Sequence, residues 1–176
     1  MPGLVAVLTV AVTTLASYWV QTRLKSREYA LARQELRLTQ MRDAMVSVYE
    51  LLNTVLKGTE DRLKIATGQY AALSDTVVNR IIDETNTSDS LWRRERETVE
   101  AGVYLYFGES RPTTEKWVNA RTSMQAYADC AEQAFMAARR SRAAHDACNK
   151  ERPAAQSAFV ELRDALIATY RAKLAS

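Results

Sequence analysis

The chain contains few residues that interrupt helices. Of its 176 residues, only five are glycine and three are proline, and there is no long low-complexity stretch. Because glycine and proline are the poorest residues for a helix interior, their scarcity favours long helices. Alanine, leucine, arginine and glutamate are abundant instead, and all four are good helix formers. The composition therefore predicts an all-α protein.

The residues of common catalytic and metal sites are also scarce. The only histidine, His145, lies three residues before Cys148. Together they offer two ligands, whereas a structural zinc site needs four. There is no glycine-rich phosphate loop, no Gly-x-Ser-x-Gly, no His-Glu-x-x-His and no pair of Glu-x-x-His motifs. We therefore expect a protein that is not an enzyme and that holds no metal or cofactor.

Cysteine is limited to Cys130 and Cys148. On one continuous helix, a spacing of 18 residues would separate them by roughly 27 Å, which is too far for a disulfide. This spacing favours two small buried side chains with reduced thiols, as expected in the cytosol. The net charge of +3 is small, and the basic residues are interleaved with acidic ones, so the charge does not indicate nucleic-acid binding.

The most prominent feature is an uncharged apolar run at residues 3–20. Eighteen helical residues extend roughly 27 Å, close to the ~30 Å hydrocarbon core of a bilayer. Tyr18 and Trp19 stand where an interfacial aromatic belt would lie, and Arg23, Lys25 and Arg27 follow. These residues predict a single transmembrane anchor, with those five side chains as its interfacial part.

Two other interpretations of the run remain open. A cleaved signal peptide would begin with basic residues and end at a small-x-small site, neither of which fits here. A core or interfacial helix is possible because 18 residues is short for a span. If the run is an anchor, the positive-inside rule places the N-terminus outside and the rest in the cytoplasm, because every nearby Lys or Arg follows the run. The expected location is the inner (plasma) membrane.

The few helix breakers predict four or five antiparallel helices. The first helix is expected to continue from the membrane to Gly58, and the second to start at Thr59 and fail in the polar stretch 85–89. A third ends at Gly108, a fourth is capped by Thr113 or Thr114, and a fifth begins at Pro153. The expected domains are a transmembrane anchor (1–22), a basic helical stalk (23–37) and a cytosolic helical bundle (38–176).

A seam of small and apolar residues follows the first helix. Beyond the apolar run, leucines recur every seven residues, as in a coiled coil. Small polar side chains continue the seam into the run at a spacing typical of helix packing in membranes. We predict a homo-oligomer, or pairing with a membrane-protein partner, along the face formed by Thr13, Ser17, Leu24, Leu31 and Leu38.

Basic residues are expected to gather at one end of the bundle. If a loop at 85–90 returned the chain to the membrane, two basic clusters would lie level with Arg23, Lys25 and Arg27. An anionic leaflet would attract such clusters, and the alternative is ordinary solvated helix ends. The candidate lipid- or partner-facing residues are Arg93, Arg94, Arg96, Arg139, Arg140, Arg142, Lys150 and Arg152.

The segment VYLYFGESRPTTEKW, residues 103–117, resembles a loose set of uncharacterised bacterial proteins. In them, one N-terminal span precedes an Arg-rich stalk and a helical bundle. The resemblance concerns architecture, covers most of the chain and implies no activity or functional residue.

Three functional classes are compatible with these features. The first is a non-catalytic, membrane-anchored accessory or scaffolding subunit of a membrane complex. The second is a pore-forming or membrane-perturbing protein of phage or toxin type, for which Thr9, Thr13 and Ser17 would form a mildly polar stripe. The third is a bundle that senses a small molecule. The lack of catalytic residues and the long first helix favour the first.

Overall fold

The described part of the chain folds into four helices. The computed structural model describes the backbone of residues 2–136 and 142–175 and the side chains of residues 17–136 and 146–175. The helices are α1 (Pro2–Ala66), α2 (Asp75–Phe107), α3 (Arg111–Met136) and α4 (Arg142–Leu174). Throughout the described backbone there is no strand, so the all-α prediction is confirmed.

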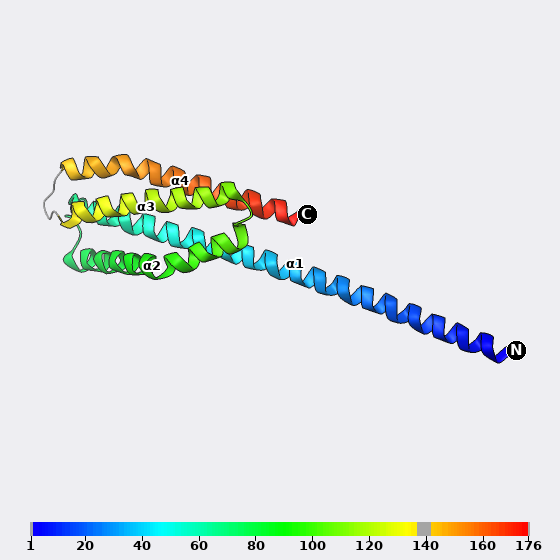
Figure 1. Cartoon of the computed structure of the whole chain (residues 1–176). Helices are drawn as coiled ribbons and strands as arrows, with labels where there is room; N and C mark the ends of the chain where they lie inside the picture. The colour runs from blue at the N-terminus through cyan, green and yellow to red at the C-terminus, as the bar shows by residue number, and fades with distance from the viewer. Residues whose placement is uncertain (1, 137–141, 176) are drawn as a thin grey trace. The chain divides into compact units, whose positions relative to one another are not determined.

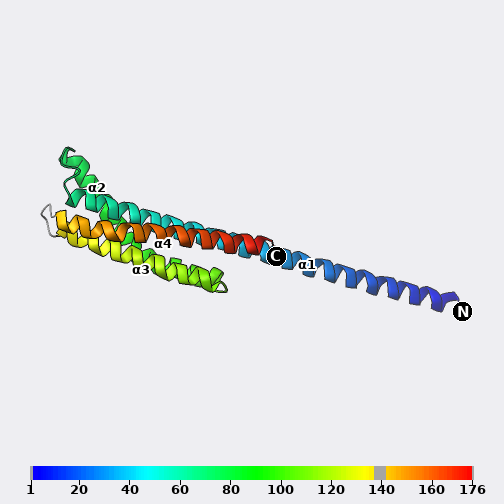
Figure 2. The ribbon, with the colours of Figure 1, turned by 90° about the horizontal axis from the view of Figure 1, so that it is seen from above.

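The chain divides into two compact units, residues 1–39 and residues 40–176. The first, here called the N-terminal unit, consists of the first part of α1. The second, here called the bundle, contains the rest of α1 together with α2, α3 and α4. In the bundle, each helix runs antiparallel to the one before it, and α3 and α4 lie side by side along their length (Figures 1 and 2).

The core of the bundle receives large side chains from all four helices. The largest fully buried ones include Met41 and Leu52 of α1, Phe107 of α2, Trp117 of α3 and Leu162 of α4. Each helix thus presents an apolar stripe to a shared interior, which is the arrangement expected of a four-helix bundle.

Gly58 does not end the first helix, contrary to the sequence-based expectation. α1 continues to Ala66 and is terminated by Gly68, whose φ of 72° lies in the left-handed region. The amide of Gly68 donates to the carbonyl of Ile65, and the amide of Gln69 donates to the carbonyl of Lys64. These two bonds form a Schellman cap. Glycine is needed at 68 for its backbone conformation, whereas the reason for glycine at 58 is different.

Gly58 lies where α1 and α2 approach closely. A Cβ atom at this position would stand 2.6 Å from Oγ and 2.8 Å from Cβ of Ser88. Ser88 belongs to the polar stretch that was expected to be a loop, yet α2 passes through it as one helix. Thr85 and Ser88 are buried, and the Ser88 hydroxyl donates to the Thr54 carbonyl of α1. The stretch is therefore polar because it forms a hydrogen-bonded contact between two helices.

Gly58→Ala is expected to lower the free energy of unfolding by about 2 kcal/mol, because the added methyl group overpacks the contact with Ser88. Urea denaturation of the two proteins measures the difference. Gly102→Ala on α2 is the matched control, since its Cβ would meet the Ala44 Cβ at an ordinary 3.6 Å. That variant should gain slight stability from helix propensity. Equal effects of the two substitutions would contradict the close contact at Gly58.

Two other helix boundaries differ from expectation. α3 begins at Arg111, and the amides of Thr113 and Thr114 both donate to the Ser110 carbonyl, so the cap lies before the two threonines. Pro153 lies inside α4, which starts eleven residues earlier at Arg142. The predicted cap at Gly108 is confirmed. Within the described ranges there are four helices and not five, because α1 includes the start of the predicted second helix and α2 joins the rest of it to the predicted third helix.

The described residues include no helix with a stretch long and apolar enough to cross a membrane. Most of the predicted span, at residues 3–16, falls outside the described side chains.

Candidate interaction surfaces

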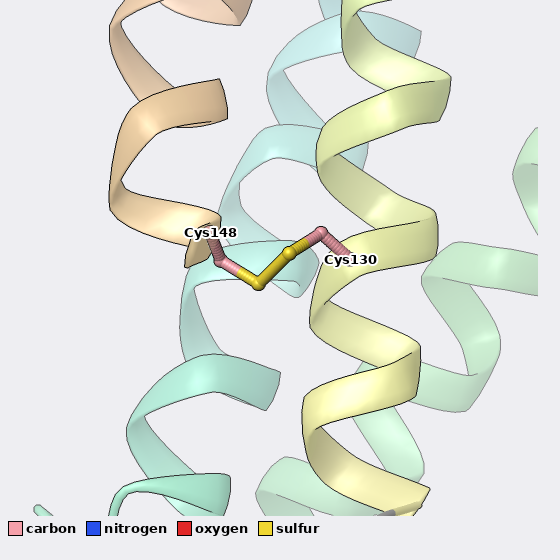
Figure 3. Close-up of a disulfide and its surroundings, with 2 residues drawn as sticks. All are labelled: Cys130 and Cys148. Atoms are coloured by element: carbon pink, nitrogen blue, oxygen red, sulfur yellow. A yellow bond between two sulfur atoms is a disulfide. The ribbon is translucent and has the colours of Figure 1, made fainter. Parts of the chain in front are cut away.

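A disulfide joins Cys130 of α3 to Cys148 of α4 (Figure 3). The expectation of two separate reduced thiols is wrong for this structure, because the chain reverses between the two residues. Their Cα atoms lie 5.6 Å apart, within the range that a disulfide spans. Cys148 is fully buried and Cys130 is partly exposed. The bond thus links the neighbouring helices at the edge of the core.

A polar cluster lies next to the disulfide along the helices. Arg152 of α4 forms an ion pair with Glu60 of α1 at 2.8 Å, and Gln156 donates to the same carboxylate at 3.4 Å. Tyr127, one turn from Cys130 on α3, is fully buried, and its hydroxyl has no hydrogen-bond partner among the described residues. Burial, supported by the Glu60 carboxylate and opposed by Arg152, raises the pKa of Tyr127 to about 12.

Tyr127→Phe is expected to leave stability at pH 7 unchanged or to raise it by up to about 1 kcal/mol, because it removes a buried hydroxyl without a partner. A tyrosine in the unfolded chain titrates near pH 10, whereas Tyr127 in the folded protein titrates near 12. The folded state therefore loses stability as pH rises from 10 to 12.

In Tyr127→Phe, the free energy of unfolding should fall less between pH 10 and 12 than it does in the unmodified protein. Urea denaturation at several pH values measures this difference. Tyr104→Phe, at an exposed position, is the control for removing one hydroxyl. A large loss of stability in Tyr127→Phe at pH 7 would contradict the assignment, because it would mean that the hydroxyl is hydrogen-bonded.

An apolar groove lies between α1 and α4 in the bundle. Its volume is about 390 Å³. The rings of Tyr49 and Phe159 meet across it with their centroids 5.3 Å apart. Glu50 and Arg163 are the charged residues of its lining, one on each helix. The apolar lining comprises Met45, Val46, Val48, Tyr49, Phe159, Leu162, Leu166 and Ile167.

The N-terminal unit exposes the residues of the predicted seam. Leu24 and Leu31 are 53% and 60% exposed, Leu38 is half-buried and Ser17 is exposed. Thr13 lies outside the described side chains. Two further apolar side chains, Tyr29 and Leu36, are exposed on the same helix. Over residues 17–37, α1 therefore shows large apolar side chains to solvent.

The predicted interfacial residues lie on the same exposed stretch of α1. The guanidinium of Arg23 lies over the Trp19 ring, 3.9 Å from its centroid, in a cation–π contact. Tyr18, Lys25 and Arg27 are exposed.

The members of the predicted basic set that the structure describes do not lie together at one end of the bundle. Since α2 has no loop at 85–90, Arg93, Arg94 and Arg96 lie in the middle of that helix. Arg94 pairs with Glu95, and Arg96 lies 5.9 Å from the centroid of the Trp92 ring. Lys150 and Arg152 are on α4, towards the end of the bundle where α1 terminates. The positions of Arg139 and Arg140, and the side chain of Arg142, lie outside what is described.

The described side chains contain no group of three or more His, Cys, Asp and Glu residues placed to hold a metal ion. His145 is outside them. The α1–α4 groove and the cluster around Tyr127 were not predicted. Some indication of the groove is present in the sequence. Val46, Tyr49 and Ile167 make the apolar stripes of their helices wider than is usual for a helix that only faces a core.

No protein-family model, characterised protein or solved structure matches this chain.

Proposed function

We propose that this protein is a non-catalytic, membrane-anchored helical scaffold that associates through the exposed face of α1. In this proposal, residues 3–20 span the inner membrane, with the N-terminus outside and the bundle in the cytoplasm. The apolar run supports the anchor, and the basic residues that follow it support the orientation. A lipid bilayer and a second copy, or a helix of a membrane protein, are its partners.

The observation that carries the proposal is the exposure of Leu24 and Leu31 on the N-terminal unit. Burial of one exposed leucine against a partner helix would stabilise the complex by about 2 kcal/mol, so the exposure of these two leucines favours pairing with another helix. Their seven-residue spacing is the repeat of a coiled coil. Two copies anchored in one bilayer would have their α1 helices parallel, which is the orientation that a parallel coiled coil along this face needs.

Replacing Leu24, Leu31 and Leu38 with asparagine is expected to abolish most of the oligomer that crosslinking detects in mild detergent. Asparagine removes the apolar contacts but allows the helix to form, so circular dichroism should change little. The matched control is Tyr29→Asn with Leu36→Asn, which alters two exposed apolar residues on another side of α1. The proposal fails if the unmodified protein is a monomer and no partner co-purifies with it.

The groove favours a second candidate function, the binding of a single-chain amphiphile with an anionic head. A volume of about 390 Å³ is within the range of ligand sites. Arg163 on its wall, which pairs with Asp164 in this structure, would turn its guanidinium to a ligand carboxylate. Isothermal titration of the full-length protein with dodecanoate tests this. Val46→Trp should fill the groove and remove binding, whereas Val118→Trp, at an exposed site on α3, should not. Binding that survives Val46→Trp would exclude the groove.

A further inference from the structure

We propose that Cys130 and Cys148 form a reversible redox staple, held as two thiols in the resting cytosol and closed into the α3–α4 disulfide by an oxidised low-molecular-weight thiol. The inference rests on the cytoplasmic location given above and not on the scaffolding role. Structural disulfides are rare in the cytosol, where those that form are usually transient and respond to redox conditions. A bundle that faces the cytosol and can form this bond is therefore placed to respond to oxidation.

The two cysteines differ in how deeply they are buried. Cys148 is fully buried, whereas Cys130 is partly exposed on α3. Because thiol–disulfide exchange needs access to a sulfur atom, a small thiol would reach the bond through Cys130. Cys148 would then be the leaving thiol during reduction and the resolving thiol during oxidation.

The exchange is balanced with two equivalents of a small thiol, RSH. On reduction, the thiolate RS⁻ attacks Cys130 Sγ, the Cys130–Cys148 bond breaks and Cys148 leaves as a thiolate that takes up a proton. A second RS⁻ attacks the mixed disulfide and releases RSSR and the Cys130 thiol. Oxidation is the reverse, in which RSSR accepts the two electrons and both protein thiols lose their protons.

Packing near the bond explains why closing it would matter for the fold. From residue 146 to 158, the buried residues of α4 are Cys148, Ala155 and Ala158. On α3, the buried residue beyond Cys130 is Ala131. These side chains are small and provide little apolar contact between the helices. The neighbouring layer contains Tyr127, whose buried hydroxyl lacks a partner among the described residues and favours hydration if the helices separate.

The first experiment measures the thiol state of the full-length protein in growing cells. Acid quenching followed by a maleimide of 5 kDa should show both thiols free, and treatment with diamide should convert most of the protein to the disulfide within minutes. A fluorescent protein fused after Ser176 reports the side of the membrane, because it fluoresces in the cytoplasm. Free thiols that diamide fails to oxidise would overturn the proposal.

A disulfide that is complete in unstressed cells would also overturn it. If the fusion is fluorescent in that case, the bond is a permanent cytosolic one and the proposed location stands. If the fusion is dark, the location fails as well, because the bundle then faces an oxidising compartment. The crosslinking of α1 described above would be unaffected by either outcome, so failure of the staple is distinguishable from failure of the scaffold.

The second experiment measures hydrogen exchange in purified full-length protein, with and without dithiothreitol. Reduction should speed exchange in residues 127–136 and 146–156 at least tenfold more than in residues 160–170, whose exchange rises only with the loss of global stability. The control is Cys130→Ala with Cys148→Ala, which should exchange like the reduced protein whether or not dithiothreitol is present. Exchange that does not change on reduction would show that the bond constrains nothing, and the staple would be rejected.

Discussion

Asp89→Ala is expected to lower the free energy of unfolding by about 3 kcal/mol, because it leaves a buried guanidinium without its counterion. Arg62 of α1 is only 7% exposed and forms an ion pair with Asp89 of α2. The loss should fall at the lower end of the range for buried pairs, since the Asp89 side chain is 33% exposed. Urea denaturation, monitored by circular dichroism, measures the change.

The control for this prediction removes both charges. Arg62→Met with Asp89→Leu replaces the pair with apolar side chains of similar size, and such replacements are often neutral. The double variant should therefore be more stable than Asp89→Ala alone. A cost below about 0.5 kcal/mol for Asp89→Ala would instead place the pair among exposed ion pairs, whose contributions are small.

The apolar periodicity of the sequence was enough to predict an all-α bundle. Where an apolar stripe was long and regular, as in the segment containing Trp117 and Met124, the predicted helix is present, although it ends earlier than expected, and both residues are fully buried. Such stripes reveal helices because burial of one face stabilises a helix more than the propensity of any single residue.

Helix boundaries could not be predicted where polar residues or glycines serve packing. Gly58 and the stretch 85–89 resemble turn signals in the sequence. In the fold, they are two sides of one close contact, because Ser88 fills the space beside Gly58 and Asp89 pairs with Arg62. A single sequence cannot show that two such segments, about thirty residues apart, compensate for each other.

The disulfide was missed because its spacing was measured along a single helix. Eighteen residues separate the cysteines by about five turns only if no reversal lies between them. Here the two cysteines belong to two antiparallel helices, α3 (Arg111–Met136) and α4 (Arg142–Leu174), so the chain direction is reversed in α4 and Cys148 lies beside Cys130. No glycine or proline marks this reversal in the sequence. The groove was missed for a similar reason, since it forms only when α1 and α4 become neighbours.

Removing the disulfide is expected to lower the free energy of unfolding by about 3 kcal/mol, the chain-entropy estimate for a closed loop of this size. The bond spans 18 positions, so it restricts the unfolded chain over that loop. Thermal and urea unfolding of Cys130→Ala with Cys148→Ala, compared with the oxidised protein, measures the difference. For a protein of this size, such a change corresponds to a fall of roughly 6–12 °C in Tm.

A comparison with the reduced protein separates the two contributions of the bond. Reduction with dithiothreitol keeps both sulfur atoms in place, so it removes the cross-link and leaves the packing of the fully buried Cys148 nearly intact. The double alanine variant loses both, but alanine is close in size, so the two unfolding free energies should agree within about 1 kcal/mol. If reduction alone has no effect while the alanine variant is much less stable, then the packing of the side chains, and not the cross-link, stabilises this part of the α3–α4 pair. The chain-entropy argument would then be wrong for this protein.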